Sequence, residues 1–334
     1  MARGPVSPPT GLRLDLTKCP ARELASAPVN RPSIGIIGTG WVGSSVAIST
    51  LHLGVARELL LYDVRSDVAE GEAMDLAHGS SFYPRATVES VGLEDMRRTS
   101  VLVVAAGRGG GPTESRLDLL RDNVRLTTDL ARVFEGYEGI VVMVSNPVDV
   151  LTFVFQRESG LPVERVIGTG TMLDTARLRE AVGRDLDLDP RSIHANVVGE
   201  HGDSEVCVWS SATVGGRHLR DWPGWSPNRE NDVAREVREA AYRIIERKGA
   251  TNHAIGLVTA NLLDGMLRDH RRILTVSVVQ TGAVGVSDVA LSLPTVVSSS
   301  GAESIVEPDL DETEAAGLEE SATRLRDAIA SIGS

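Results

Sequence analysis

A glycine-rich segment near residue 40 has the residue types and spacing of a dinucleotide-binding turn. Gly38-Thr39-Gly40-Trp41-Val42-Gly43 lies between a short apolar run and a helical pattern, and Asp63 ends the next apolar run, twenty residues after Gly43. Glycines let a backbone approach a pyrophosphate, to which a helix N-terminus offers N–H groups and a positive dipole. Asp63 would accept hydrogen bonds from the adenosine ribose and repel a 2′-phosphate, which favours NAD over NADP. The alternative is a tight glycine turn with a surface aspartate.

Four later segments carry groups suited to proton transfer and anion binding: 107–117, 145–149, 173–177 and 199–204. The imidazole of His201 can hold or release a proton near neutral pH. The planar guanidinium of Arg177 matches a carboxylate. Each residue also has a plainer interpretation: His201 as a loop residue, Arg177 as a solvated or ion-paired side chain, and Asp174 as a helix cap or as the partner of Arg177 on one helix face. Only their joint occurrence favours a catalytic site.

In this order, the segments resemble the lactate/malate dehydrogenase family, and more closely its lactate dehydrogenase branch. The resemblance also rests on Glu-Ala-Met-Asp-Leu at 72–76 and Lys-Gly-Ala-Thr at 248–251, and it extends from about residue 33 to 331. It implies an NAD-dependent, reversible reduction of a 2-keto acid to an L-2-hydroxy acid.

The resemblance also implies a role for each residue. His201 is the general acid and base, Asp174 orients its imidazole, and Arg116 polarises the keto oxygen. Arg177 anchors the substrate carboxylate, Asn146 contacts substrate and cofactor, and Thr251 forms part of the pocket wall. The implied cofactor-binding set comprises Gly38, Gly40, Trp41, Val42, Gly43, Asp63, Ala106, Gly107, Val144, Asn146 and Ile255. No metal is implied.

Gly110 departs from the family pattern at the position that contacts the substrate side chain, six residues before Arg116. Lactate enzymes typically carry Gln there and malate enzymes Arg. Glycine cannot pair with a second carboxylate and leaves room for a longer or branched side chain, and Arg108 is two residues out of register. Asn252-His253 also stands where family members usually have an aromatic residue. This change either indicates a polar substrate side chain or is drift at a helix start. We therefore expect a substrate other than lactate or malate.

Strands that alternate with helices must position these residues. Apolar runs at 34–37, 58–62, 101–105 and 140–144 are typical of buried parallel strands, and helical patterns at 44–53, 67–78 and 114–134 lie between them. Later segments predict helices at 228–247, 253–268 and 311–332 and antiparallel hairpins at 273–297. The predicted fold is α/β, with a Rossmann doubly wound parallel sheet at 32–168 and an α+β substrate domain at 169–334. The Pro-rich residues 1–31 are interpreted as a loosely ordered arm.

Composition and sequence pattern argue against several partners, bound metals and targeting segments. The 334 residues carry a formal net charge of −12, which disfavours nucleic acid and anionic membranes. The two cysteines, Cys19 and Cys207, are far apart, which argues against a disulfide framework and a zinc site. No apolar stretch has the length of a membrane span, and the N-terminus lacks the apolar core of a secretory signal. We expect a cytoplasmic protein.

Two other functions stay open at this point. One is malate dehydrogenase, which Gly110 disfavours. The other is a catalytically idle NAD-binding sensor or interaction subunit, which the intact set of Arg116, Asp174, Arg177 and His201 disfavours. The resemblance implies a homodimer or homotetramer, with helices after residue 228 as candidate interface elements. Arg179 and His194 resemble the pair that binds fructose 1,6-bisphosphate in regulated bacterial members, but unregulated members often carry the same residue types.

Overall fold

Six parallel strands bring their carboxyl ends to one edge of the main sheet. A computed structural model describes residues 32–108 and 116–332, with the side chain of Arg116 excluded, so the predicted arm at 1–31 and Gly110 lie outside the described residues. The parallel strands lie in the order β3-β2-β1-β4-β5-β6. Chain progression reverses between β1 and β4, and open α/β sheets bind ligands at such a switch point. Their bounds are β1 Ser33–Ile37, β2 Glu58–Tyr62, β3 Thr87–Ser90, β4 Val101–Val104, β5 Ile140–Met143 and β6 Val166–Gly168.

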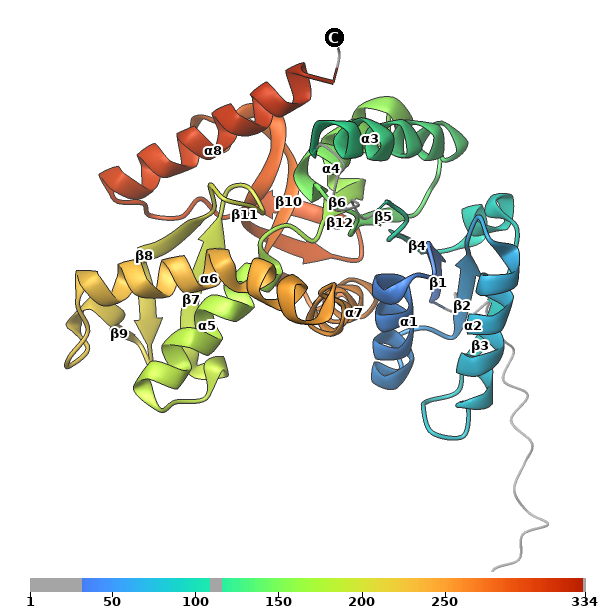
Figure 1. The fold of residues 1–334 in the computed structure, drawn as a ribbon, viewed down its shortest axis with the longest axis horizontal. Helices are drawn as coiled ribbons and strands as arrows, with labels where there is room; N and C mark the ends of the chain where they lie inside the picture. Colours follow the sequence, from blue (N-terminus) through green and yellow to red (C-terminus); the bar gives the residue numbers. More distant parts are fainter. Residues whose placement is uncertain (1–31, 109–115, 333–334) are drawn as a thin grey trace, which may run out of the picture. The chain divides into compact units, whose positions relative to one another are not determined.

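The central strands are buried on both faces, as their unbroken apolar runs predict. In β4, Leu102 and Val104 face one core, and Val101 and Val103 face the other. Helices α3 and α4 cover the first face, and α1, α2 and α7 cover the second (Figure 1). These helices span Trp41–Leu53 (α1), Ser66–His78 (α2), Arg116–Val133 (α3), Val148–Ser159 (α4) and His253–Leu267 (α7).

Three antiparallel strands extend the same sheet beyond β6. They are β10 (Arg272–Thr281), β11 (Ser287–Ser298) and β12 (Gly301–Ile305), and β10 pairs with β6 through Ser277 and Gly168. The antiparallel pairing predicted at 273–297 is confirmed. The sheet nevertheless has nine strands and crosses residue 168, so it is mixed rather than purely parallel, and the described residues belong to one compact unit. The boundary between 168 and 169 stays a prediction.

A smaller sheet carries the segment that contains His201. It consists of β7 (Ile193–Val198), β8 (Val206–Val214) and β9 (Arg217–His218). Helices α5 (Met172–Leu186) and α6 (Pro227–Lys248) pack on it through an apolar core that includes Trp209. Gly199, which follows β7, pairs with Ser292 of β11 through two backbone hydrogen bonds of 2.9 Å. Its φ of 88° suits glycine, and a Cβ there would lie 2.7 Å from Ser321 Oγ. This bridge fixes where the His201 segment leaves the small sheet.

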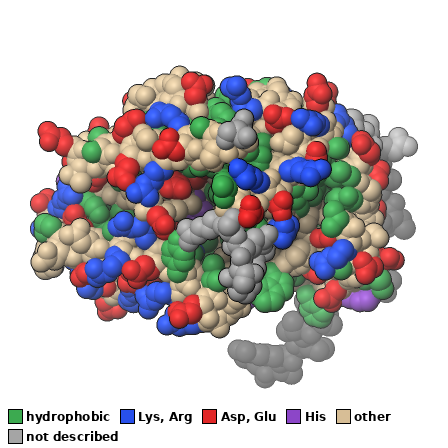
Figure 2. Space-filling model, turned by 45° about the horizontal axis from the view of Figure 1, so that its top comes forward, with side chains coloured by type: hydrophobic (Ala, Val, Ile, Leu, Met, Phe, Trp, Pro, Cys, Tyr) green, Lys and Arg blue, Asp and Glu red, His purple; other side chains and the backbone are tan. Residues whose placement is uncertain are grey.

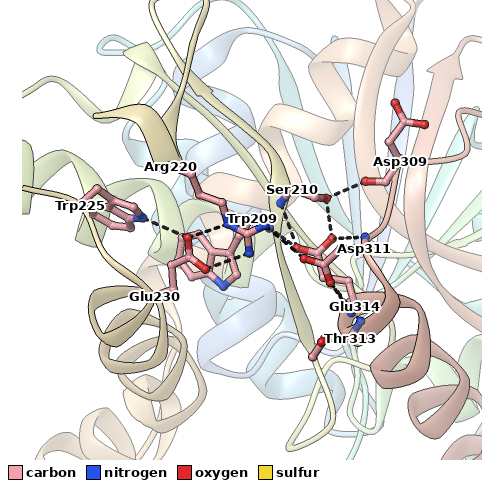
Figure 3. Close-up of polar contacts among 9 residues, drawn as sticks. All are labelled: Trp209, Ser210, Arg220, Trp225, Glu230, Asp309, Asp311, Thr313 and Glu314. Atoms are coloured by element: carbon pink, nitrogen blue, oxygen red, sulfur yellow. Dashed lines mark hydrogen bonds and ion pairs between the residues drawn. The ribbon is translucent and has the colours of Figure 1, made fainter. Parts of the chain in front are cut away.

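The last helix, α8 (Glu312–Ala330), is joined to the small sheet by a buried carboxylate. Glu314 accepts hydrogen bonds from the backbone N–H groups of Trp209 and Ser210, at 2.7 and 3.0 Å (Figure 3). It also closes a capping box with Asp311 at the helix N-terminus. Arg220 connects this network to α6 by pairing with both Asp311 and Glu230. The network has paired partners throughout and no unexplained polar group, so we assign it a structural role.

Acidic and basic side chains are interspersed over the face drawn in Figure 2. None of the helices at 32–108 and 116–332 is long and apolar enough to cross a membrane.

Candidate active site

The glycine turn between β1 and α1 has the close backbone packing that its spacing predicts. Gly38 has a φ of 93°, and a Cβ there would lie 2.6 Å from the backbone N of Ala106. A Cβ on Gly43 would lie 1.9 Å from the Gly38 carbonyl oxygen, so this position in α1 excludes any larger residue. Gly40 faces open space, with no atom within 4 Å of a Cβ built there. The turn thus leaves an open approach at the N-terminus of α1, where a pyrophosphate fits.

Asp63 lies at the carboxyl end of β2 and braces this turn. Its Oδ2 accepts the Thr39 backbone N–H at 2.9 Å, and its Oδ1 accepts the Arg65 backbone N–H at 3.0 Å. Burial opposes ionisation, but the two backbone N–H groups and the Thr39 hydroxyl outweigh it and lower the pKa of Asp63. Asp63 is therefore a fixed negative charge in a cleft of about 670 Å³ at the switch point.

The cleft gathers part of the predicted cofactor set. Gly38, Gly40, Asp63, Ala106 and Gly107 line it. Other members of the set lie outside this cleft. Trp41 lines a separate hollow together with His253, whereas Val42 and Ile255 pack against the hydrophobic core from α1 and α7. Val144 is buried after β5, and Gly43 is enclosed in α1.

The loops that follow β4 and β5 are tied together by Asn123, a buried residue of α3. Its Oδ1 accepts the Arg108 backbone N–H at 2.8 Å, and its Nδ2 donates to the Asn146 carbonyl oxygen at 3.0 Å. Asn146 itself is exposed, and its Oδ1 accepts the Val148 N–H at 3.3 Å. The Arg108 guanidinium pairs with Asp122 on α3 and lines the cofactor cleft.

Asp174, Arg177 and His201 meet in one hydrogen-bonded trio. Asp174 on α5 is buried; its Oδ1 accepts from Arg177 Nη1 at 2.7 Å, and its Oδ2 lies 2.5 Å from His201 Nδ1. A carboxylate at Nδ1 fixes the N–H on that nitrogen and leaves Nε2 to exchange a proton. The His201 side chain is 23% exposed and that of Arg177 15% exposed, so both can reach a small anion. Arg177 also pairs with Asp174 on one helix face, as the plainer interpretation of these two residues predicts. The same carboxylate binds the His201 imidazole, which that interpretation does not predict.

The trio has the charges of a proton donor beside an anion site. Burial disfavours the imidazolium form of His201, but the Asp174 carboxylate outweighs this effect and raises the pKa of His201 to about 9. Burial likewise disfavours the charged form of Asp174, and the neighbouring His201 and Arg177 nonetheless lower its pKa. His201 therefore carries a proton at neutral pH.

Two buried carboxyl groups near His201 were missed by the sequence analysis. Asp149 on α4 accepts the His201 backbone N–H at 2.7 Å. Glu205 is 8% exposed, and burial, reinforced by Asp174, raises its pKa to about 8. An acidic residue within the apolar first turn of α4 is the sequence feature that could have identified Asp149. No feature of the sequence marks Glu205 except its position four residues after His201, and no feature marks Asn123.

The remaining predicted residues are placed only in part. Arg116 begins α3, and its side chain lies outside the described residues, as does Gly110. Thr251 is half-buried between α6 and α7. Arg179 on α5 donates to the Ala195 carbonyl oxygen at 3.0 Å, and His194 on β7 is exposed.

Two family models and several known proteins match most of this chain. Residues 33–168 match the model of the lactate/malate dehydrogenase NAD-binding domain, and residues 171–333 match that of the family's alpha/beta C-terminal domain. The L-lactate dehydrogenase of Kosmotoga olearia is 43% identical over 90% of this chain and 96% of its own length. That of Salinibacter ruber is 41% identical over 91% of this chain and 98% of its own. The minor L-lactate dehydrogenase of Enterococcus mundtii superposes with a TM-score of 0.88 at 36% identity, covering 90% of this chain and 98% of the relative.

The chain belongs to the lactate/malate dehydrogenase family, on its lactate dehydrogenase side. It is an NAD-dependent 2-hydroxy-acid dehydrogenase, as the order of its motifs predicted.

Proposed function

We propose that His201 transfers the proton in the reduction of a 2-keto acid to an L-2-hydroxy acid, while Arg177 binds the substrate carboxylate. The hydrogen-bonded trio carries this proposal. His201 Nε2 gives its proton to the keto oxygen as that atom becomes an alkoxide, and Asp174 stabilises the imidazolium before transfer. In the oxidation direction, neutral His201 accepts the hydroxyl proton. Arg116, at the start of α3, is proposed to polarise the keto oxygen, Asn146 to contact substrate and cofactor, and Thr251 to form part of the pocket wall.

The cofactor cleft fits NAD. The open space at Gly40 and the N-terminus of α1 suit a pyrophosphate, and the fixed charge of Asp63 suits ribose hydroxyls and disfavours a 2′-phosphate. NADH, when bound, supplies the hydride. Of the wider predicted set, Trp41, Val42, Val144 and Ile255 are proposed to act through the shape of the turn and the pocket rather than by lining the adenosine cleft.

We propose further that the substrate is a 2-keto monocarboxylate with a bulkier or more polar side chain than the methyl group of pyruvate. Glycine at position 110 gives neither the amide typical of lactate enzymes nor the guanidinium typical of malate enzymes. Arg108 pairs with Asp122 on α3 and lines the cofactor cleft, and it lies two residues out of register for the position that would bind a second substrate carboxylate.

A panel of 2-keto acids tests this specificity. Oxidation of NADH, with NADPH in parallel, is measured against pyruvate, oxaloacetate, and branched, aromatic and polar-substituted keto acids. We expect a bulky or polar substrate to exceed pyruvate by more than tenfold in kcat/KM, which corresponds to about 1.4 kcal/mol, and NADH to be preferred. Preference for pyruvate would refute the Gly110 argument, and preference for oxaloacetate would require Arg108 to leave Asp122. Turnover of no keto acid in the panel would refute the proposed substrate class.

We propose that two copies of the chain associate through the face formed by α1, α2 and α7. Trp41 and Ile48 on α1 and Met74 on α2 are 63%, 48% and 54% exposed. A hollow of about 590 Å³ lies among α1, α2 and the segment joining α6 to α7, and Trp41 and Ile48 line it. Exposed apolar residues gathered around a hollow favour a protein partner, and a symmetric copy is the commonest one.

Sedimentation measures this association. We expect the wild-type protein to be dimeric or larger, and Ile48→Glu to shift it toward monomer because it places a charge in the apolar face. Val306→Glu, at an exposed apolar residue after β12, is the matched control and should not change the association. A monomeric wild-type protein at micromolar concentration would contradict the proposal.

A further inference from the structure

Asp149 is a buried carboxylate that the proton transfer described above does not use. It is the second residue of α4, 2% exposed, and three residues after Asn146. Its Oδ2 accepts the His201 backbone N–H at 2.7 Å. Its Oδ1 has no hydrogen-bond partner of good geometry within 32–108 and 116–332, although the Ser277 hydroxyl of β10 lies beside it. Buried carboxylate oxygens normally each have at least one hydrogen-bond donor, so this one is costly for the fold, and its strongest contact is with the backbone of His201.

We propose that Asp149 is a positioning residue for keto-acid reduction, which anchors the His201 backbone and places a second negative charge beside its imidazole. The proposal rests on the proposed role of His201. His201 is then held at two points, by α4 at its backbone N–H and by α5 at Nδ1. Because α4 starts directly after the loop of Asn146, the contact also fixes the proton donor relative to the loop predicted to contact cofactor and substrate.

Charged groups from three helices and from the loop of His201 act on this imidazole, either directly or through one another. They are Asp174 and Arg177 on α5, Asp149 on α4, Glu200 and Glu205 on the loop, and Arg238 on α6, which acts on Glu205. Among them, Asp174 raises the pKa of His201 most, Asp149 follows, and Glu205 contributes less. Removal of the Asp149 charge should therefore lower the His201 titration, but by less than removal of Asp174.

The pH dependence of the free energy of unfolding separates a positioning role of Asp149 from a purely structural one. Burial raises the pKa of Asp149 to about 6, against the opposing effects of Ser277 and the His201 backbone N–H. The folded state therefore disfavours the ionised form, and this cost appears as pH rises from the ordinary value of 3.8 through about 6. Asp149→Asn keeps an acceptor for the His201 N–H and removes the charge. It should unfold at a higher temperature than wild type at pH 7, and the difference should vanish below about pH 4.

The deciding experiment titrates His201 directly in the full-length protein. The rate of carbethoxylation by diethyl pyrocarbonate reports the neutral imidazole, and His201→Asn provides the background from the other histidines. We expect Asp149→Asn to lower the His201 midpoint by about 0.5–1 pH unit and to move the alkaline limb of keto-acid reduction by the same amount. Asp149→Ala, which also removes the backbone acceptor, should lower kcat at least about tenfold further.

Glu314→Gln is the matched control, because Glu314 is also buried and accepts backbone N–H groups but belongs to the α8 network. It should leave the His201 midpoint unchanged. An unchanged midpoint in Asp149→Asn, or a loss of stability in that variant at pH 7, overturns the proposal, and this variant decides it even if Asp149→Ala does not fold. If His201→Asn keeps full activity, the proposed function fails, whereas the carbethoxylation midpoint still shows whether Asp149 acts on His201.

Discussion

Replacing His201 by asparagine is expected to lower kcat for 2-keto acid reduction by about two to four orders of magnitude. Asparagine keeps a side chain of similar polarity but cannot deliver a proton to the forming alkoxide. Affinity for NADH should be unaffected, because the cofactor cleft lies at the ends of β1, β2 and β4 and does not include His201. Steady-state rates with the best keto acid and fluorescence titration with NADH measure the two quantities.

His218→Asn is the control for this substitution. His218 is an exposed histidine on β9, outside the trio, and its replacement should leave both kcat and NADH affinity as in wild type. A His201→Asn enzyme within tenfold of the wild-type rate would assign the proton donor to another group. Glu205, whose pKa is raised to about 8, would be the next residue to substitute.

Asp174→Asn should have the second-largest effect, because one carboxylate serves both cations of the trio. Without it, burial of His201 is opposed only by weaker charges, so the His201 pKa should fall from about 9 toward or below its ordinary value of 6.5. Reduction needs protonated His201. The wild-type rate should therefore be level up to about pH 8 and fall tenfold per unit above about 9, and the variant should lose activity from near-neutral pH upward. We expect at least about a hundredfold loss in kcat/KM at pH 7.5.

The same pair sets a pH window for stability. The raised pKa of His201 contributes stability that is complete below 6.5 and lost as pH rises through about 9. The lowered pKa of Asp174 contributes stability that is complete above 3.8 and lost as pH falls. The difference in melting temperature between wild type and Asp174→Asn should thus be largest between pH 4 and 6.5. Equal pH–rate profiles in the two proteins would contradict this account.

Residues defined by local spacing were predictable from the sequence. The turn Gly38–Gly43 and Asp63 depend on a strand, a tight turn and a helix that follow each other directly, and the structure has these elements at those positions. His201 comes from a different segment than Asp174 and Arg177, which share α5, and its proximity to them could be predicted only from the resemblance of ordered motifs to a family.

Contacts that depend on partner choice were not predictable. The Val-, Ser-, Thr- and Gly-rich composition of 273–297 identified β10 and β11 as antiparallel strands, but not that β10 would pair with β6, which has only three residues. Asp149 and Asn123 act through side chains on the inner faces of α4 and α3. Which face of a helix turns inward near its end, and which loop it meets, is decided by packing of the whole sheet rather than by the residues beside it in the chain.

The continuous nine-stranded sheet limits how freely evolution or an engineer can exchange the two halves of this chain. A crossover with another family member at residue 168 would cut between β6 and the antiparallel strands that complete its edge. The donor half would then have to match the recipient in strand twist and hydrogen-bond register, and not only in the chemistry of its pocket. Substrate preference in this protein is therefore more open to change through its loops than through the recombination of whole halves.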